Sequence, residues 1–282
     1  MNDRVAVITG SSSGFGLLTA VELAKRGYRV VASMRELGRR GRLDEVAKTA
    51  NVAERIEVRC LDITNGELVN AVMSDIVRDY GRIDLLVNNA GFALAGFAED
   101  ITLSELREQF ETNFFGHVAV TKAVIPTMRA QSSGHIVMVT SIAGRTAHPT
   151  LSSYSSSKYA LEGWTESLRM ELRSVGIHVV LVEPGAYETD IWTRNAKIGR
   201  RAFDGTSPNA ERGRRFRDYV QSGGIKKADP QEVARLIADV AEDNKPRLRY
   251  LAGTDARVQL MLKTAMPWRW YERVITKAIK ID

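Results

Sequence analysis

Short apolar segments and longer segments with helical periodicity alternate along the whole chain. Seven apolar segments, rich in β-branched residues, are predicted strands at residues 4–9, 29–33, 55–61, 83–89, 135–141, 177–183 and 247–252. Amphipathic patterns lie between them, the first containing Leu17, Val21 and Ala24 and stopping at Gly27. Further helices are predicted roughly at residues 65–80, 103–130, 153–175 and 230–243. This alternation predicts repeated βα units and a parallel sheet.

Seven strands with helices between them favour one doubly wound sheet over two smaller domains. We therefore predict an α/β fold in which residues 1–282 form a single domain. Nucleotide ligands of such sheets bind outside the carboxyl ends of the strands, where the strand order reverses. We expect residues 190–228 to form a substrate lid and residues 255–282 a C-terminal extension. The extension is basic and apolar. We expect it to pack on the domain or on a partner subunit; the alternative is a helix that lies on a membrane surface.

Composition limits the classes of protein to which the chain can belong. Its single cysteine, Cys60, excludes an intramolecular disulfide and a cysteine-based zinc site, and its four histidines show no metal-ligand spacing. We expect no metal and a cytoplasmic location, since no secretory leader or membrane span is predicted. The net charge of +6 is spread along the chain except at residues 193–217, which we interpret as a solvated loop and not as a nucleic-acid site.

The segment VAVITGSSSGFG places glycines 10, 14 and 16 between the first strand and the first helix. Glycine permits positive φ and close approach of the backbone to a pyrophosphate, and the N-terminus of the following helix offers unpaired N–H groups. The spacing G-x-x-x-G-x-G differs from the general dinucleotide fingerprint G-x-G-x-x-G. Its position directly after the first strand still favours a phosphate site.

The second strand ends in the segment VVASMREL, which bears on the choice of cofactor. Many NAD-binding folds have an acidic residue there for the adenosine ribose, whereas an arginine accommodates a 2′-phosphate. Met34 occupies the place of the acid and Arg35 follows it. We therefore predict NADP as the cofactor and consider NAD less favoured.

Polar residues also follow the third, fourth and fifth strands. Asp62 and Ile63 end the third strand, residues 88–91 (NNAG) the fourth, and Ser141 the fifth. These strand ends are expected to converge on one crevice. Tyr154 and Lys158 follow at i and i+4, so they share one helical face and can project into that crevice together.

In this combination the sequence resembles the single-domain branch of the short-chain dehydrogenase/reductase family. The motifs are TGSSSGFG, NNAG, Asn113, Ser141, YSSSK and EPG, and the likeness runs from Arg4 to about Thr189. A lone Y-x-x-x-K is common by chance, but the full set is specific for the fold and for nicotinamide-dependent chemistry. We accordingly predict a Rossmann-type sheet whose strands, counted along the chain, have the order 3-2-1-4-5-6-7.

The resemblance implies a catalytic set of Asn113, Ser141, Tyr154 and Lys158. Tyr154 is expected to donate its phenolic proton while hydride passes to a substrate carbonyl. The ammonium of Lys158 is expected to favour the phenolate, because a free tyrosine has a pKa of about 10. Ser141 would steady the carbonyl oxygen, and Asn113 would anchor a water that relays protons.

The resemblance also implies a set of cofactor contacts. They are expected from Gly10, Ser12, Ser13, Gly14, Phe15, Gly16, Arg35, Asp62, Ile63, Asn89, Ala90, Gly91, Tyr154, Lys158, Pro184, Gly185 and Thr189. One departure is Tyr187, which stands where the family often has Val or Ile and is able to intrude on the pocket. Apolar lid residues, among them Ile191, Trp192, Phe203 and Phe216, indicate an apolar substrate.

These observations favour an NADP(H)-dependent oxidoreductase acting on a ketone or aldehyde and the corresponding alcohol. The alternatives are an NAD(H)-dependent dehydrogenase of the same family and a catalytically idle cofactor sensor or scaffold. A nucleic-acid or membrane-surface binder is a third class, which lacks an aromatic stripe or a contiguous basic helix. The family resemblance also implies a homodimer or homotetramer formed through the helices that carry Asn113 and Tyr154.

Overall fold

A seven-stranded parallel sheet forms the centre of the computed structural model, which describes residues 3–203, 207–221 and 227–278. The strands are β1 (Val5–Thr9), β2 (Arg29–Met34), β3 (Ile56–Cys60), β4 (Leu85–Asn88), β6 (Gly134–Val139), β7 (Ile177–Pro184) and β9 (Arg249–Ala252). Their spatial order is β3-β2-β1-β4-β6-β7-β9, and every pairing is parallel. When these seven are counted along the chain, this is the predicted order 3-2-1-4-5-6-7, which is therefore confirmed.

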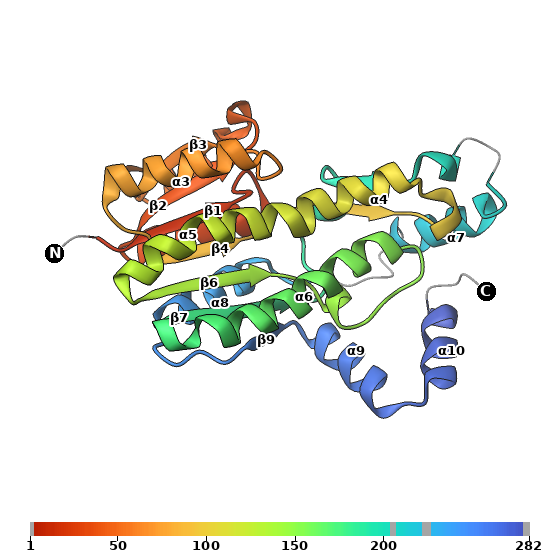
Figure 1. Ribbon diagram of the computed structural model, residues 1–282. Coiled ribbons are helices and arrows are strands. Elements are labelled where there is room, and N and C mark those ends of the chain that lie inside the picture. Colours follow the sequence, from red (N-terminus) through yellow and green to blue (C-terminus); the bar gives the residue numbers. More distant parts are fainter. Residues whose placement is uncertain (1–2, 204–206, 222–226, 279–282) are drawn as a thin grey trace.

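Helices cover both faces of this sheet (Figure 1). The main ones are α1 (Gly14–Lys25), α2 (Gly41–Thr49), α3 (Gly66–Tyr80), α5 (His117–Gln131), α6 (Ser152–Leu172) and α8 (Gln231–Glu242). One apolar core joins the sheet to α1, α2 and α8, and a second joins it to α3, α5 and α6. The predicted α/β architecture with helices on both faces is thus observed.

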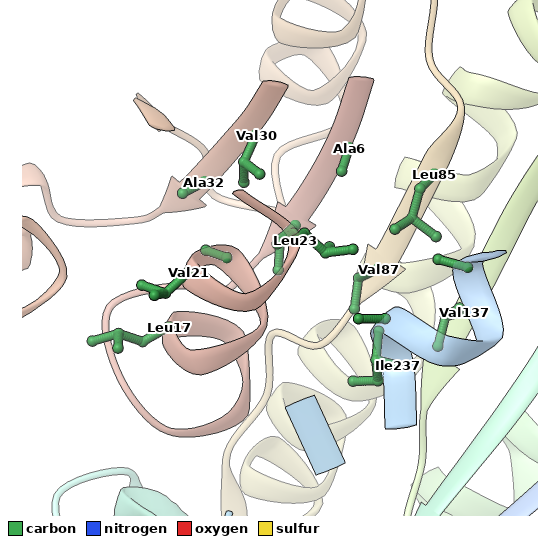
Figure 2. Close-up of a cluster of buried hydrophobic side chains, with 14 of the residues drawn as sticks. Ala6, Leu17, Val21, Leu23, Val30, Ala32, Leu85, Val87, Val137 and Ile237 are labelled. Atoms are coloured by element: carbon green, nitrogen blue, oxygen red, sulfur yellow. The ribbon is translucent and has the colours of Figure 1, made fainter. Parts of the chain in front are cut away.

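The central strands are apolar throughout because both of their faces are buried. All five residues of β1 are buried, and alternate residues enter different cores: Ala6 and Ile8 lie in the first, Val5 and Val7 in the second. Figure 2 shows part of the first core, where Leu23 of α1 points towards the strands that carry Ala6 and Val87. These two cores hold the strand ends, and therefore the loops that follow them, in fixed positions.

The long helix predicted at residues 103–130 has an interruption in the structure. It consists of α4 (Leu103–Phe110), a π-helical turn (Glu111–Gly116) and α5. Asn113, predicted as catalytic, lies in the π-helical turn. Such turns are rare and occur frequently at functional sites.

The segment predicted as a lid contains a short 3-10 turn (Asp190–Trp192), β8 (Ala196–Ile198) and α7 (Ala210–Gln221). Strand β8 pairs in parallel with β5 (Ala93–Ala95), which anchors the segment next to the loop after β4. Several of its basic side chains form local ion pairs, such as Arg194 with Asp190 at 2.6 Å, in keeping with a solvated loop.

The C-terminal extension folds into α9 (Thr254–Ala265) and α10 (Trp268–Ala278), which turn away from the end of β9 in Figure 1. Helix α9 packs on the body of the protein, where Gln259 Oε1 lies 2.9 Å from Nε2 of His148. Within the described ranges, no helix is long and apolar enough to cross a membrane.

Candidate functional site

The glycine-rich loop after β1 is packed too tightly for larger residues. Gly10 has φ +72°, and a Cβ added to it would lie 2.7 Å from Cα of Ala90. A Cβ on Gly16 would lie 2.4 Å from the carbonyl oxygen of Gly10. The glycines therefore bring the loop against the end of β4 and allow α1 to begin immediately after it.

The N-terminus of α1 suits a phosphate group. The residue preceding it, Ser13, makes no side-chain capping hydrogen bond within the described part of the chain. The first-turn N–H groups of a helix have no intrahelical partner, and the helix dipole favours an anion there. Thr189, from the turn after β7, lies beside this loop, because a Cβ on Gly14 would be 3.5 Å from Cβ of Thr189. The predicted residues Gly10, Ser13, Gly14 and Thr189 thus come together and fit a dinucleotide pyrophosphate.

Asn89 ties the end of β4 to the glycine-rich loop. Its Nδ2 donates to the carbonyl oxygens of Thr9 at 2.9 Å and Gly10 at 3.1 Å. The preceding Asn88 is fully buried and donates instead to Oγ1 of Thr121 at 2.8 Å, so its role is structural. Of the two asparagines in the NNAG motif, Asn89 therefore fixes the glycine-rich loop and Asn88 joins β4 to α5.

The ends of β2 and β3 form the next part of the same edge. The N–H of Ser11 donates to the carbonyl of Ser33 at 2.9 Å, so the end of β2 runs beside the glycine-rich loop. Arg35 follows with a side chain that is 68% exposed and 3.6 Å from Glu36. Asp62 Oδ1 accepts from the N–H of Thr64 at 3.0 Å, and Ile63 is buried. Arg35 thus presents an exposed cationic side chain to an anionic ligand at this edge.

Tyr154 and Lys158 lie on one face of α6, one turn apart, and both are almost fully buried. Lys158 Nζ donates to the carbonyl of Val139, at the end of β6, at 3.0 Å, and lies 5.8 Å from the centroid of the Tyr154 ring. Ser141 follows β6, and its Oγ accepts from the N–H of Ala143 at 3.1 Å. The three predicted side chains therefore meet at one strand end.

Burial shifts the pKa values of this pair in opposite directions. It raises the pKa of Tyr154 to about 12, although a hydrogen bond with Ser141 acts to lower it. It lowers the pKa of Lys158 to about 8. Both shifts favour the neutral form, since a low-dielectric interior disfavours charge. The expectation that the ammonium of Lys158 holds down the phenol pKa therefore differs from the structure, in which burial of Tyr154 dominates.

Asn113 uses its side chain to hold the loop after β4. Its Oδ1 accepts from the N–H of Phe92 at 3.2 Å, and its Nδ2 donates to the carbonyl of Phe92 at 3.0 Å. Gly91 lies against this amide, with a Cβ position 3.1 Å from Oδ1. Asn113 therefore lies at the site, but both ends of its amide already have partners.

Apolar side chains of the segment predicted as a lid lie against Tyr154. The Trp192 ring stands edge-on to the Tyr154 ring, with centroids 5.6 Å apart. Ile191 packs on the small cluster formed by Ala93, Ala143 and Tyr154. The side chains of Phe203 and Phe216, which the sequence also placed in the lid, lie outside the described residues.

The comparisons with known proteins agree with this geometry. Residues 4–198 match the family model described as short chain dehydrogenase. The chain belongs to the short-chain dehydrogenase/reductase family. It is 41% identical over 280 residues to YusZ, an uncharacterized oxidoreductase from Bacillus subtilis, with 99% of each chain covered. It is 38% identical over 255 residues to human retinol dehydrogenase 8, which covers 87% of this chain and 80% of that protein.

Solved structures of this family are similar over most of the chain. A short-chain dehydrogenase from Streptomyces avermitilis superimposes with a TM-score of 0.82 at 33% identity, covering 99% of this chain and 97% of that one. ElxO, solved with NADP bound, has a TM-score of 0.73 at 26% identity, covering 89% and 96%. A family member from Burkholderia phymatum, in complex with NAD, has a TM-score of 0.78 at 26% identity, covering 93% of each chain. The protein is thus an NAD(P)-dependent oxidoreductase of this family.

Two residues of this short-chain dehydrogenase lie behind the site and were missed from the sequence. His117 Nε2 lies 2.6 Å from the carbonyl oxygen of Ala90, and burial lowers the pKa of the ring to about 3. Asp255, at the start of α9, accepts from the N–H of Ala186 at 2.8 Å. His117 stands at i+4 from Asn113 on one helical face, a signal that was available in the sequence. Asp255 gave no comparable signal.

The turn after β7 differs from one expectation. Ser141 Oγ donates to the carbonyl of Pro184 at 3.5 Å, and the N–H of Gly185 donates to Ala252 at 2.9 Å. Tyr187 is 2% exposed and packs in the first core, with its ring 5.5 Å from that of Phe15. The suggestion that Tyr187 intrudes on the substrate pocket was therefore wrong, because the ring is buried in the first core beside Phe15.

Proposed function

We propose that this protein is an NADP(H)-dependent oxidoreductase that interconverts ketones or aldehydes and their alcohols, with Tyr154 as the proton donor and acceptor. The observation that carries the proposal is the buried Tyr154–Lys158 pair beside Ser141, at the sheet edge that also holds an uncapped helix N-terminus. A phosphate cradle and a proton donor at one edge suit nicotinamide-dependent chemistry.

The side chains have separate tasks in carbonyl reduction. When bound, NADPH would supply the hydride. Ser141 and Tyr154 together hold the carbonyl oxygen, and Tyr154 donates its proton as negative charge develops there. Lys158, whose pKa is lowered to about 8, replaces that proton near neutral pH. Since the amide of Asn113 is bound to Phe92, the water proposed for the proton relay would rest on the Asn113 backbone.

The residues around α1 and β2 suit the cofactor. The loop of Gly10 to Gly16 and the first turn of α1 would hold the pyrophosphate. Asn89 would fix this loop to β4, and Thr189 would lie beside it. The exposed guanidinium of Arg35 would pair with a 2′-phosphate, which favours NADP over NAD. Solved relatives contain NADP in one case and NAD in another, so the comparisons do not decide between the cofactors. The preference for NADP therefore rests on Arg35.

The substrate that suits this site is apolar. Ile191 and Trp192 of the lid lie against Tyr154, together with Ala93 and Ala143. A pocket of aliphatic and aromatic side chains around few polar groups binds hydrophobic molecules. The name of one relative, retinol dehydrogenase 8, agrees with a large apolar alcohol or aldehyde.

The test is a screen of NADPH oxidation over ketones, aldehydes, quinones, steroids and retinoids, repeated with NADH. We expect turnover with apolar carbonyl compounds and a higher kcat/KM for NADPH. A clear preference for NADH would contradict the cofactor assignment. No turnover on the panel, together with tight salt-sensitive binding to DNA or anionic vesicles, would contradict the function itself.

A further inference from the structure

A buried cluster of charged side chains lies directly behind Lys158. It joins Glu162 of α6, Glu183 of β7 and Arg249 of β9. The side chains of Glu162 and Glu183 are 5% and 1% exposed, and the Arg249 guanidinium donates hydrogen bonds to both. Charged groups are rarely this buried unless they are paired, and the proton chemistry proposed above does not use any of the three.

Glu162 continues the line of proposed catalytic residues along α6. Tyr154, Lys158 and Glu162 stand at i, i+4 and i+8, so they share one helical face. The turn after β6 closes over Glu162, since a Cβ on Gly144 would lie 2.9 Å from its Cγ. Glu162 is thus confined between that turn and Arg249, one helical turn from Lys158.

Charged groups on the elements that pack around Lys158 and Glu162 also act on these two side chains. Glu166 on α6 also pairs with Arg249, and Arg145 after β6 lies 3.4 Å from Glu183. His117 of α5 faces Lys158, but its depressed pKa keeps it neutral. Among these groups, Glu162 is the carboxylate that raises the pKa of Lys158 against the lowering caused by burial.

We propose that Glu162 is a positioning residue that keeps Lys158 protonated and thereby sets the upper pH limit of proton donation by Tyr154. The inference rests on the proposed function of the Tyr154–Lys158 pair. Arg249 holds Glu162 in place and favours its ionised form, whereas burial and Glu183 act against ionisation and raise its pKa to about 7. Above that pH, Glu162 is a carboxylate over the range in which Lys158 would otherwise lose its proton.

The test is the pH profile of carbonyl reduction by Glu162→Gln. Removal of a unit charge one helical turn away is expected to move the descending high-pH limb of kcat/KM to lower pH by about one unit. Glu162→Asp keeps the charge and should restore most of the shift. Glu166→Gln is the matched control, because it removes a carboxylate from the same helix and the same Arg249, but at a half-exposed position.

A second measurement does not depend on turnover. The pKa of Lys158 Nζ, followed by NMR in ¹⁵N-lysine-labelled protein and assigned with Lys158→Arg, should fall in Glu162→Gln and not in Glu166→Gln. The wild-type signal should also respond to the ionisation of Glu162 near pH 7. This response is measurable even if Glu162→Gln does not fold.

The outcomes separate the two proposals. If the wild type reduces carbonyls but the Glu162→Gln profile and the Lys158 pKa match the wild type, the role of Glu162 is wrong and the proposed function stands. If the wild type shows no turnover while the Lys158 pKa still falls, the proposed function is wrong and the electrostatic link remains. A wild-type Lys158 signal with no step from the ionisation of Glu162 on the acid side of its own titration would also overturn the role of Glu162.

Discussion

Burial determines the chemical state of the reactive side chains. Tyr154 and Lys158 are both more than 95% buried, and both are shifted towards their neutral forms. A neutral phenol is the form that donates a proton, so this state suits the reducing direction. The reverse reaction needs the phenolate, for which the charge on Lys158 matters most.

At the scale of single residues, Arg35→Ala tests the choice of cofactor. Loss of a guanidinium that binds the 2′-phosphate should lower kcat/KM for NADPH by about 10- to 100-fold and change the value for NADH little. Arg39→Ala is the matched control, since Arg39 is also exposed and also pairs with Glu36. Equal losses with both cofactors would contradict a specific phosphate contact.

His117 predicts a pH dependence of stability. Its pKa is about 3 in the folded protein and 6.5 in the unfolded chain, so the unfolded chain binds the proton more readily. Its contribution to the free energy of unfolding is therefore complete above about pH 6.5 and is lost by about 1.4 kcal/mol per unit as pH falls towards 3. Urea unfolding should show that His117→Gln removes this slope. If the free energy of unfolding of His117→Gln has the same pH slope as that of the wild type between pH 6 and about 4.5, a neutral buried ring is contradicted.

The sequence predicted those site residues that can be recognised by their local spacing. Tyr154, Lys158 and the glycines were found because they follow strands or share a helical face. Asp255 was not found, because its partner Ala186 is 69 residues away and only the packing of α9 brings them together. The direction of the Tyr154 pKa shift was also missed, since its burial depends on tertiary contacts such as that with Trp192.

At the scale of elements, the site is an assembly of strand ends that other elements hold in place. Strands β1, β4, β6 and β7 deliver their loops to one edge, and α9 fixes the loop after β7 through Asp255. The seven strands were predictable from apolar periodicity, and their order from the family resemblance. Helix α2, the β5–β8 pair and the π-helical turn were not, because each depends on tertiary contacts or on a one-residue change of hydrogen-bond register.

The link from α9 predicts that Asp255→Ala loosens the turn of Pro184 and Gly185. Loss of a charge-assisted hydrogen bond to Ala186 should raise the KM for NADPH by about 10-fold, with a smaller effect on kcat. Steady-state kinetics test this, with Glu272→Ala, an exposed change in the same extension, as the control. An unchanged KM would show that the turn holds its shape without α9.

At the scale of the whole molecule, the helices that carry Asn113 and Tyr154 expose large apolar side chains. Phe115 in the π-helical turn is 50% exposed, and Met170 on α6 is 72% exposed. Contiguous apolar patches mark association surfaces, whereas single exposed apolar side chains are common, so the family resemblance is the main support for an interface here. We therefore propose, as the family resemblance implies, that two copies meet through these helices.

Sedimentation velocity tests this proposal. The wild type should sediment as a dimer or tetramer of the 31.3 kDa chain, and Phe115→Glu should shift it towards the monomer. The same change at an exposed apolar residue of the extension, Met261→Glu, should leave assembly intact. A monomeric wild type would contradict the proposal.

The most direct test of the whole account compares Tyr154→Phe with Tyr159→Phe. Both remove one hydroxyl from α6, but Tyr159 is 40% exposed and its hydroxyl donates to the carbonyl of Arg145. With an active carbonyl substrate and NADPH, Tyr154→Phe should lose at least about 100-fold in kcat while its Kd for NADPH stays within about threefold, and Tyr159→Phe should remain active. Substantial reductase activity in Tyr154→Phe would contradict its role as the proton donor.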